Sequence, residues 1–130
     1  MADLSKIPTT YLEKITDMLT GDASAAGTMY VGMGNDGTEA AASDTDLIDP
    51  SDEARSSCVE SQPTSLVAQW VGSITVTENQ DLKEYGLFET AGTGTPPTGG
   101  QMLARANVTA GQAVLIDDVV EITATITVSQ

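Results

Sequence analysis

The chain has no histidine, one cysteine and only five aromatic residues among its 130. Without histidine, neither a Cys–His nucleophile pair nor a histidine-based metal or acid–base site is available to it. The single thiol, Cys58, excludes an internal disulfide, and we expect it to be a small filler, buried or half-buried. Because aromatics are scarce, valine, isoleucine, leucine and alanine must fill most of the core, and this mixture with abundant threonine favours strands.

Basic residues are equally scarce. Five Lys and Arg stand against nineteen Asp and Glu, which gives a net charge of −14. Such a surface repels phosphate backbones and anionic lipid, so we expect neither nucleic-acid nor membrane partners. At about 1 M salt the Debye length falls to roughly 3 Å and the self-repulsion nearly vanishes. The composition is therefore typical of a protein from a hypersaline setting; the alternatives are an ordinary acidic protein or one that binds a basic partner.

Long apolar runs are absent too. No stretch approaches the 18 apolar residues that a membrane-spanning helix needs, so no span is expected. The N-terminal sequence MADLSKIPTTYLEKI has no basic segment followed by an apolar run, and we expect no secretory signal.

What is present predicts a single domain over residues 1–130, with a helix at about 8–20 and a β-sandwich over about 27–130. Pro8 stands at the start of the helix, the segment TYLE at 10–13 has capping-box spacing, and Gly21 is placed to end it. We expect its apolar stripe to pack on its own domain, with docking onto a partner as the alternative. The stripe consists of Tyr11, Leu12, Ile15, Met18 and Leu19.

Most of the remaining sequence has strand character. We expect short strands at 28–33 and, weakly, at 55–60, followed by strands at 66–77, 82–89 and 101–108. The final run, 120–128, alternates strictly between apolar and polar residues, which is typical of a half-buried antiparallel strand. Five or six strands after one helix predict a mainly β protein, an antiparallel β-sandwich or a curled antiparallel sheet. Its expected structural residues include Trp70, Ile122 and Ile126.

The segment GMGNDG at 32–37 fits the G-x-G-x-x-G pattern of dinucleotide-binding loops. Such a loop must open a long helix within a strand–helix–strand unit, but Pro50 and the acids before it allow only one or two helical turns. The carboxylates would also repel a diphosphate. We therefore expect a structural turn, with Asn35, Asp36 and Gly37 supplying the permissive backbone and Gly34 contributing to it, and no cofactor.

The acid-rich segment that follows, with Asp44, Asp46 and Asp49, has the oxygen density of calcium sites but not EF-hand spacing. We expect a solvated loop, with a specific cation site as the weaker alternative. Asp117 and Asp118 are expected in a strand, where neighbouring side chains point to opposite faces, so they suggest no catalytic pair. With no nucleophile in a recognisable setting, the sequence predicts no enzyme site.

The two arginines are expected to pair with carboxylates in a structural role rather than to bind a ligand. Arg105 lies in a predicted strand, where its guanidinium can reach a carboxylate such as Glu84, and Arg55 is expected to pair with a nearby acid. Beside Gly86, the apolar residues Leu87 and Phe88 are expected to anchor the core.

Several short motifs, in this order, resemble small structural proteins of tailed bacterial and archaeal viruses, the tail-fibre-like or minor virion proteins. They are LTG at 19–21, YVGMG at 30–34, TDL at 45–47, the pair Glu53 and Arg55, EYGLFE at 84–89, MLAR at 102–105 and ITATITV at 122–128. The acidic insertion around 46–52 and the few basic residues depart from the pattern and point to a haloarchaeal host.

The resemblance implies a virion structural protein that assembles with itself and with other virion proteins on the particle surface or tail. A capsid decoration or vertex (turret) protein is one alternative. A receptor- or carbohydrate-binding module at a fibre tip, facing a host surface receptor, is another, and exposed aromatics on one sheet face would favour it.

Overall fold

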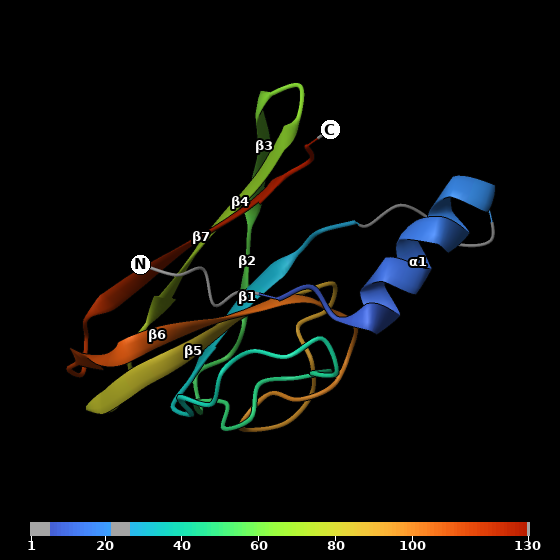
Figure 1. Ribbon diagram of the computed structural model, residues 1–130. Helices are drawn as coiled ribbons and strands as arrows, with labels where there is room; N and C mark the ends of the chain where they lie inside the picture. The colour runs from blue at the N-terminus through green and yellow to red at the C-terminus, as the bar shows by residue number, and fades with distance from the viewer. Residues whose placement is uncertain (1–5, 22–26, 130) are drawn as a thin grey trace.

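A computed structural model describes residues 6–21 and 27–129. The protein is mainly β: two antiparallel sheets and one N-terminal helix form a β-sandwich (Figure 1), as the sequence predicts. The helix α1 covers Thr9–Thr20. The strands are β1 (Tyr30–Gly34), β2 (Ser56–Ser57), β3 (Val59–Thr64), β4 (Val67–Thr75), β5 (Gln80–Phe88), β6 (Met102–Val114) and β7 (Val119–Thr127).

The two sheets have the strand orders β2-β1-β5-β6 and β3-β4-β7; we call them sheet A and sheet B. Every pairing between these strands is antiparallel. The expected strand at 55–60 is in fact two strands, because the chain leaves sheet A after Ser57 and enters sheet B at Val59. The described chain thus has seven strands instead of five or six.

The core between the sheets has two parts. One gathers Met33, Leu82 and Val114 from sheet A with Ile74 and Val120 from sheet B and Val76, which directly follows β4. The other is built on Tyr11, Met29, Val31, Leu87 and Leu103. Trp70, Ile122 and Ile126 pack against this second part, half-buried, so the predicted alternation of β7 does turn its apolar side chains inward.

Helix α1 ends as expected but packs differently. Gly21, with φ 84°, closes it in the left-handed conformation, whereas Pro8 at its N-terminus provides no side-chain cap, so the predicted capping box is wrong. The prediction that the whole apolar stripe packs on its own domain is also wrong. Tyr11 is buried and Ile15 is half-buried, but Leu12 is 48% exposed and Leu19 83% exposed.

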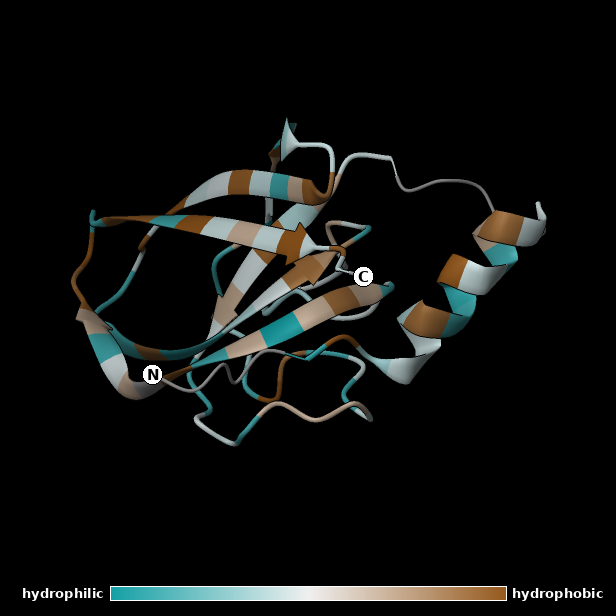
Figure 2. Cartoon of the chain, turned by 45° about the horizontal axis from the view of Figure 1, so that its top comes forward, coloured by the Kyte–Doolittle hydropathy of each residue, from teal (hydrophilic) through white to brown (hydrophobic). Residues whose placement is uncertain are grey.

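The reason is geometric. Tyr11 and Lys14, near the start of the helix, reach Glu89, which directly follows β5. Beyond this attachment α1 extends away from the sandwich, with its apolar residues (brown) spread along it (Figures 1 and 2).

The turn between β6 and β7 also differs from expectation. Strand β6 continues to Val114, and Asp117 and Asp118 lie in the turn that follows, not in a strand. Asp118 accepts a hydrogen bond from the Leu115 N–H at 2.8 Å, and Asp117 has φ 72°. Aspartates favour such turns because their short side chains bond the nearby main chain.

Candidate functional site

A third layer covers the outer face of sheet A. It consists of the segments 35–55 and 89–101, which are irregular apart from isolated bridges. Leu47 from the first segment packs with Phe88 and Met102 in a separate buried cluster. Phe88 is thus an anchor, as predicted, but for this outer layer and not for the core between the sheets.

Glycines in the strands make room for this layer. A Cβ on Gly34 would lie 2.5 Å from Glu84 Oε1, and one on Gly86 would lie 2.6 Å from Phe88 Cε2. Gly34 and Gly32 both belong to β1 and are buried, so the expectation that Gly34 contributes to a turn is wrong. Because Gly32 and Gly34 have no side chains, they leave space on the outer face of sheet A for the buried side chains of Arg55 and Glu84.

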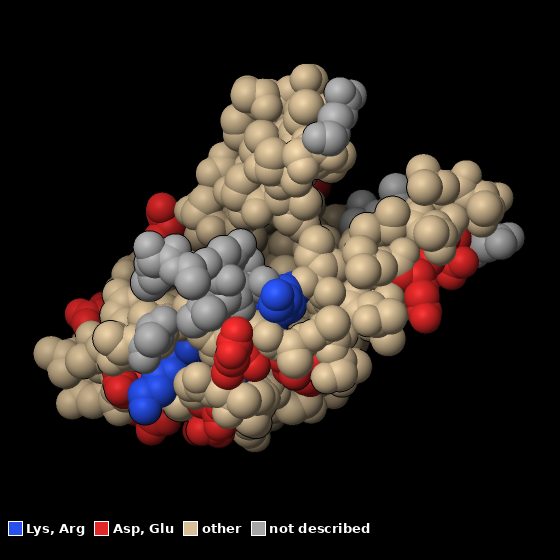
Figure 3. Space-filling model, viewed as in Figure 1, with Lys and Arg blue, Asp and Glu red and all other residues tan. Residues whose placement is uncertain are grey.

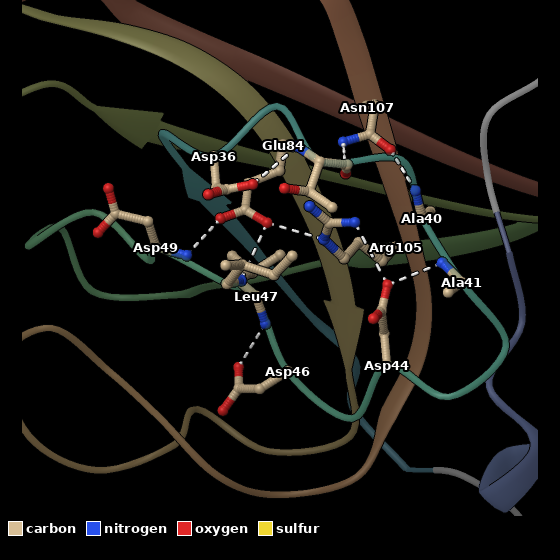
Figure 4. A network of polar contacts seen from close by, with 12 residues as sticks. Asp36, Ala40, Ala41, Asp44, Asp46, Leu47, Asp49, Glu84, Arg105 and Asn107 are labelled. Atoms are coloured by element: carbon tan, nitrogen blue, oxygen red, sulfur yellow. Dashed lines mark hydrogen bonds and ion pairs between the residues drawn. The ribbon is translucent and has the colours of Figure 1, made fainter.

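The first of these charged groups is Arg105 in β6, whose side chain is fully buried (Figure 4). Its Nε donates to Glu84 Oε2 at 2.7 Å, which confirms the predicted pair, and its Nη1 donates to Asp44 Oδ2 at 3.3 Å. Both carboxylates also accept main-chain N–H groups of segment 35–55. Asp44 accepts the Ala41 N–H at 2.9 Å. Glu84 accepts the N–H groups of Ile48 (3.1 Å) and Asp49 (2.7 Å).

The second is Arg55, which lies over the ring of Phe88 with its guanidinium carbon 3.4 Å from the ring centre. Its Nη2 donates to Asp46 Oδ1 at 3.1 Å, which confirms pairing with a nearby acid. Its Nη1 donates to the carbonyls of Thr90 (3.2 Å) and Gly99 (2.8 Å), and Asp46 Oδ2 accepts the Gly99 N–H at 2.8 Å. Arg55 therefore ties the two segments of the outer layer to each other.

Glu53 does not pair with Arg55, although the two stand close together in the motif. Its Oε1 accepts the main-chain N–H and the hydroxyl of Thr77, both at 2.9 Å, and the Gln80 amide at 2.8 Å. Burial alone would raise the pKa of this carboxyl, but the hydrogen bonds, led by the Thr77 N–H, outweigh it and lower the pKa.

The acidic segment is therefore not the solvated loop that we expected. Asp44 and Asp46, with side chains only 17% and 25% exposed, hold the two arginines, while the side chain of Asp49 is exposed. Within residues 6–21 and 27–129, no three His, Cys, Asp or Glu side chains are arranged to hold a metal ion. What these carboxylates do chemically is fasten loops to a sheet.

Sequence reasoning missed some members of the outer layer. Asn107 accepts the Ala40 N–H at 2.7 Å and donates to the Thr38 carbonyl at 2.8 Å, which fixes the first part of segment 35–55. A signal was present: Gly32 and Gly34 are two residues apart in β1, and they pair with Gly86 and Glu84 of β5. Glycines that recur on one strand face indicate a close approach to that face.

Sheet B has few charged residues, unlike the acidic outer layer on sheet A. Among the residues of its strands β3, β4 and β7, only Glu60 and Glu121 are charged. In Figure 3 the acidic atoms (red) lie over the lower body and α1, whereas the upper part formed by the β3–β4 hairpin is nearly all uncharged. At this end Leu66 is 49% exposed and Val128 62%, and Val59 at the start of β3 is 76% exposed.

A groove of about 760 Å³ lies between sheet A and β7, on the side where β6 and β7 are the outermost strands. Its apolar lining includes Ile7, Leu87, Ala104, Ile122, Ala124 and Ile126. In the part of the chain that the structure describes, the sandwich is therefore open along β7.

Comparison with known proteins gave no family to which the chain can be assigned. No protein-family model matches the sequence, and none of the curated proteins matches it. Among the described residues, no helix has the length and apolar character to cross a bilayer.

Proposed function

We propose that this chain is a virion structural protein of a tailed virus, an oligomeric building block of the particle surface or tail. The motifs of the sequence suggest this class. The observation that carries the proposal is the distribution of charge: in a chain of net charge −14, most acidic residues lie outside the strands, and the strands of sheet B carry only Glu60 and Glu121.

A neutral sheet is the natural place for subunits of such a protein to meet. Burying carboxylates between two copies costs desolvation and repulsion, whereas burying apolar side chains is favourable. Sheet B and its ends expose Val59, Leu66, Val119 and Val128, whose burial between copies would be favourable.

The outer layer suits the same role. A particle protein must keep its shape without enzymatic chemistry, and here Arg55 and Arg105 fasten irregular segments to sheet A from buried positions. A high-salt environment would weaken surface ion pairs but screens buried ones much less. The proposed haloarchaeal host is consistent with this arrangement.

A capsid decoration or vertex protein remains a variant of the same proposal. A carbohydrate-binding module is less well supported, because none of the five aromatic side chains is fully exposed. Tyr11 and Phe88 are buried, and Tyr30, Trp70 and Tyr85 are half-buried.

The test is particle composition. Virus particles from a culture carrying the gene are banded in a density gradient, and their proteins are identified and counted by mass spectrometry. We expect the chain in the particle band in many copies per particle, with a replication protein of the same virus as the negative control. Abundant chain in the lysate and none in the band would contradict the proposal.

A further inference from the structure

Strand β7 stands out among the outermost strands of the two sheets. The other three are short, covered or interrupted. Strand β2 has two residues. Strand β6 is bridged at Arg105 by the main chain of Lys6, with hydrogen bonds of 2.9 and 3.1 Å, and its pairing with β5 is interrupted by two register shifts. Strand β3 contains Pro63 and a register shift between Ser61 and Thr64. These are the features that keep sheet edges from pairing with other chains.

Among residues 6–21 and 27–129, strand β7 has none of them. Its nine residues pair with β4 without a register shift, and VVEITATIT contains no proline, lysine or arginine. Just after β7, the Val128 N–H donates to the Leu66 carbonyl on the β4 side. Just before β7, the Asp118 carbonyl accepts the Val76 N–H, also on the β4 side. Because main-chain groups alternate in direction along an antiparallel strand, the odd-numbered residues of β7 direct their N–H and C=O groups to the open side.

We infer that β7 pairs with β7 of a second copy of this chain, antiparallel about a two-fold axis at Thr123. The inference rests on the proposed assembly function and names the surface that it uses. Thr123 is the middle residue of Val119–Thr127, so a two-fold axis there opposes the full length of both strands. The five odd-numbered residues then form about ten main-chain hydrogen bonds between the copies.

The charge pattern favours a second copy as the partner. The one charged residue of β7, Glu121, falls opposite Thr125 of the other copy, so no carboxylates face each other across the axis. A strongly acidic protein repels itself elsewhere, and β7 with its neighbour β4 presents a single carboxylate to the partner.

The apolar faces also match. On the groove side, Val120 falls opposite Ile126 of the other copy, and Ile122 opposite Ala124. The pairing would therefore extend sheet B from three strands to six and continue its apolar inner face across the axis.

The experiment is site-specific cross-linking in the full chain with Cys58 replaced by serine. One variant adds Thr123→Cys and the matched control adds Thr127→Cys, which lies on the same exposed face of the same strand. Across the axis the two Thr123 Cα atoms would lie about 5.5 Å apart, within disulfide range. The two Thr127 Cα atoms would lie about 27 Å apart, since eight residues of strand separate them at about 3.4 Å each.

Under mild oxidation at high salt we expect most of the Thr123→Cys chain to migrate as a covalent dimer, and at least tenfold less of the Thr127→Cys chain. Equal cross-linking of the two variants, or none of the Thr123→Cys chain, would overturn the inference. Circular dichroism of both variants confirms that each is folded.

A second variant reads the register without a thiol. Thr125→Lys places a lysine opposite Glu121 of the other copy twice per dimer, and we expect dimerisation roughly fivefold tighter, with Thr125→Glu weaker by a similar factor. No difference between the two would contradict the register.

Light scattering of the unmodified chain separates this inference from the function. If the unmodified chain is an oligomer but the Thr123→Cys variant does not cross-link, β7 pairing is refuted and the assembly function still stands. A monomer that is also absent from virus particles refutes both.

Discussion

Replacing Arg105 with alanine should destabilise the protein far more than replacing a surface lysine. Arg105 and Glu84 are both fully buried, and the change leaves the Glu84 carboxylate with only the Ile48 and Asp49 N–H groups. Removing one partner of a buried ion pair costs about 3–5 kcal/mol. With an unfolding entropy of about 2.1 cal/mol/K per residue over 130 residues, this lowers Tm by about 10–20 °C.

The control is Lys83→Ala. Lys83 lies 3.8 Å from Asp81 with both side chains about half exposed, and such pairs contribute about 0–1 kcal/mol. Its Tm should therefore change by less than about 4 °C. Both variants are compared with the unmodified chain by calorimetry at one fixed salt concentration. Equal shifts for the two variants would refute the reasoning that the outer layer depends on buried charge.

Three further predictions concern single positions. Gly34→Ala places a methyl group 2.5 Å from Glu84 Oε1 and should cost about 1–3 kcal/mol in denaturant unfolding, whereas Gly27→Ala, with nothing within 4 Å, should cost far less; equal costs would contradict the packing argument. Burial, with Glu89 nearby, raises the pKa of Tyr11 to about 12, so Tyr11 stays protonated when the unfolded chain ionises and stability should fall as pH rises from 10 to 12. Absorbance at 295 nm should show a late titration that Tyr11→Phe removes. Burial also raises the pKa of the Cys58 thiol, so it should react more slowly with a disulfide reagent at pH 8 in the folded protein than after unfolding; equal rates would contradict this.

Features with a local pattern were predicted well from the sequence. Strand β7 alternates strictly, and its inward side chains follow from that period. Gly21 ends α1 because the left-handed conformation favours glycine. The Arg105–Glu84 pair was predictable because an arginine that is buried in a strand needs a carboxylate partner, and Glu84 lies in another predicted strand.

The failures involve contacts between segments that are distant in the sequence. Amphipathicity shows that α1 has an apolar face but not what covers it, and the helix touches the sandwich near its start through Tyr11 and Lys14. Strand β3, VESQPT, is exposed throughout and has no buried face to give it a pattern, so its strand character follows from its pairing with β4. The outer layer was missed because Asp46 and Arg55 meet the 89–101 segment only in the folded chain.

The measurement that tests the account most directly is absolute mass by light scattering after gel filtration, at about 0.1 M and about 3 M sodium chloride. Screening should remove most of the repulsion between copies at the higher salt, where the Debye length is well under 10 Å. The account predicts a discrete oligomer with an even number of chains at high salt. A well-folded monomer at both salt concentrations would contradict it.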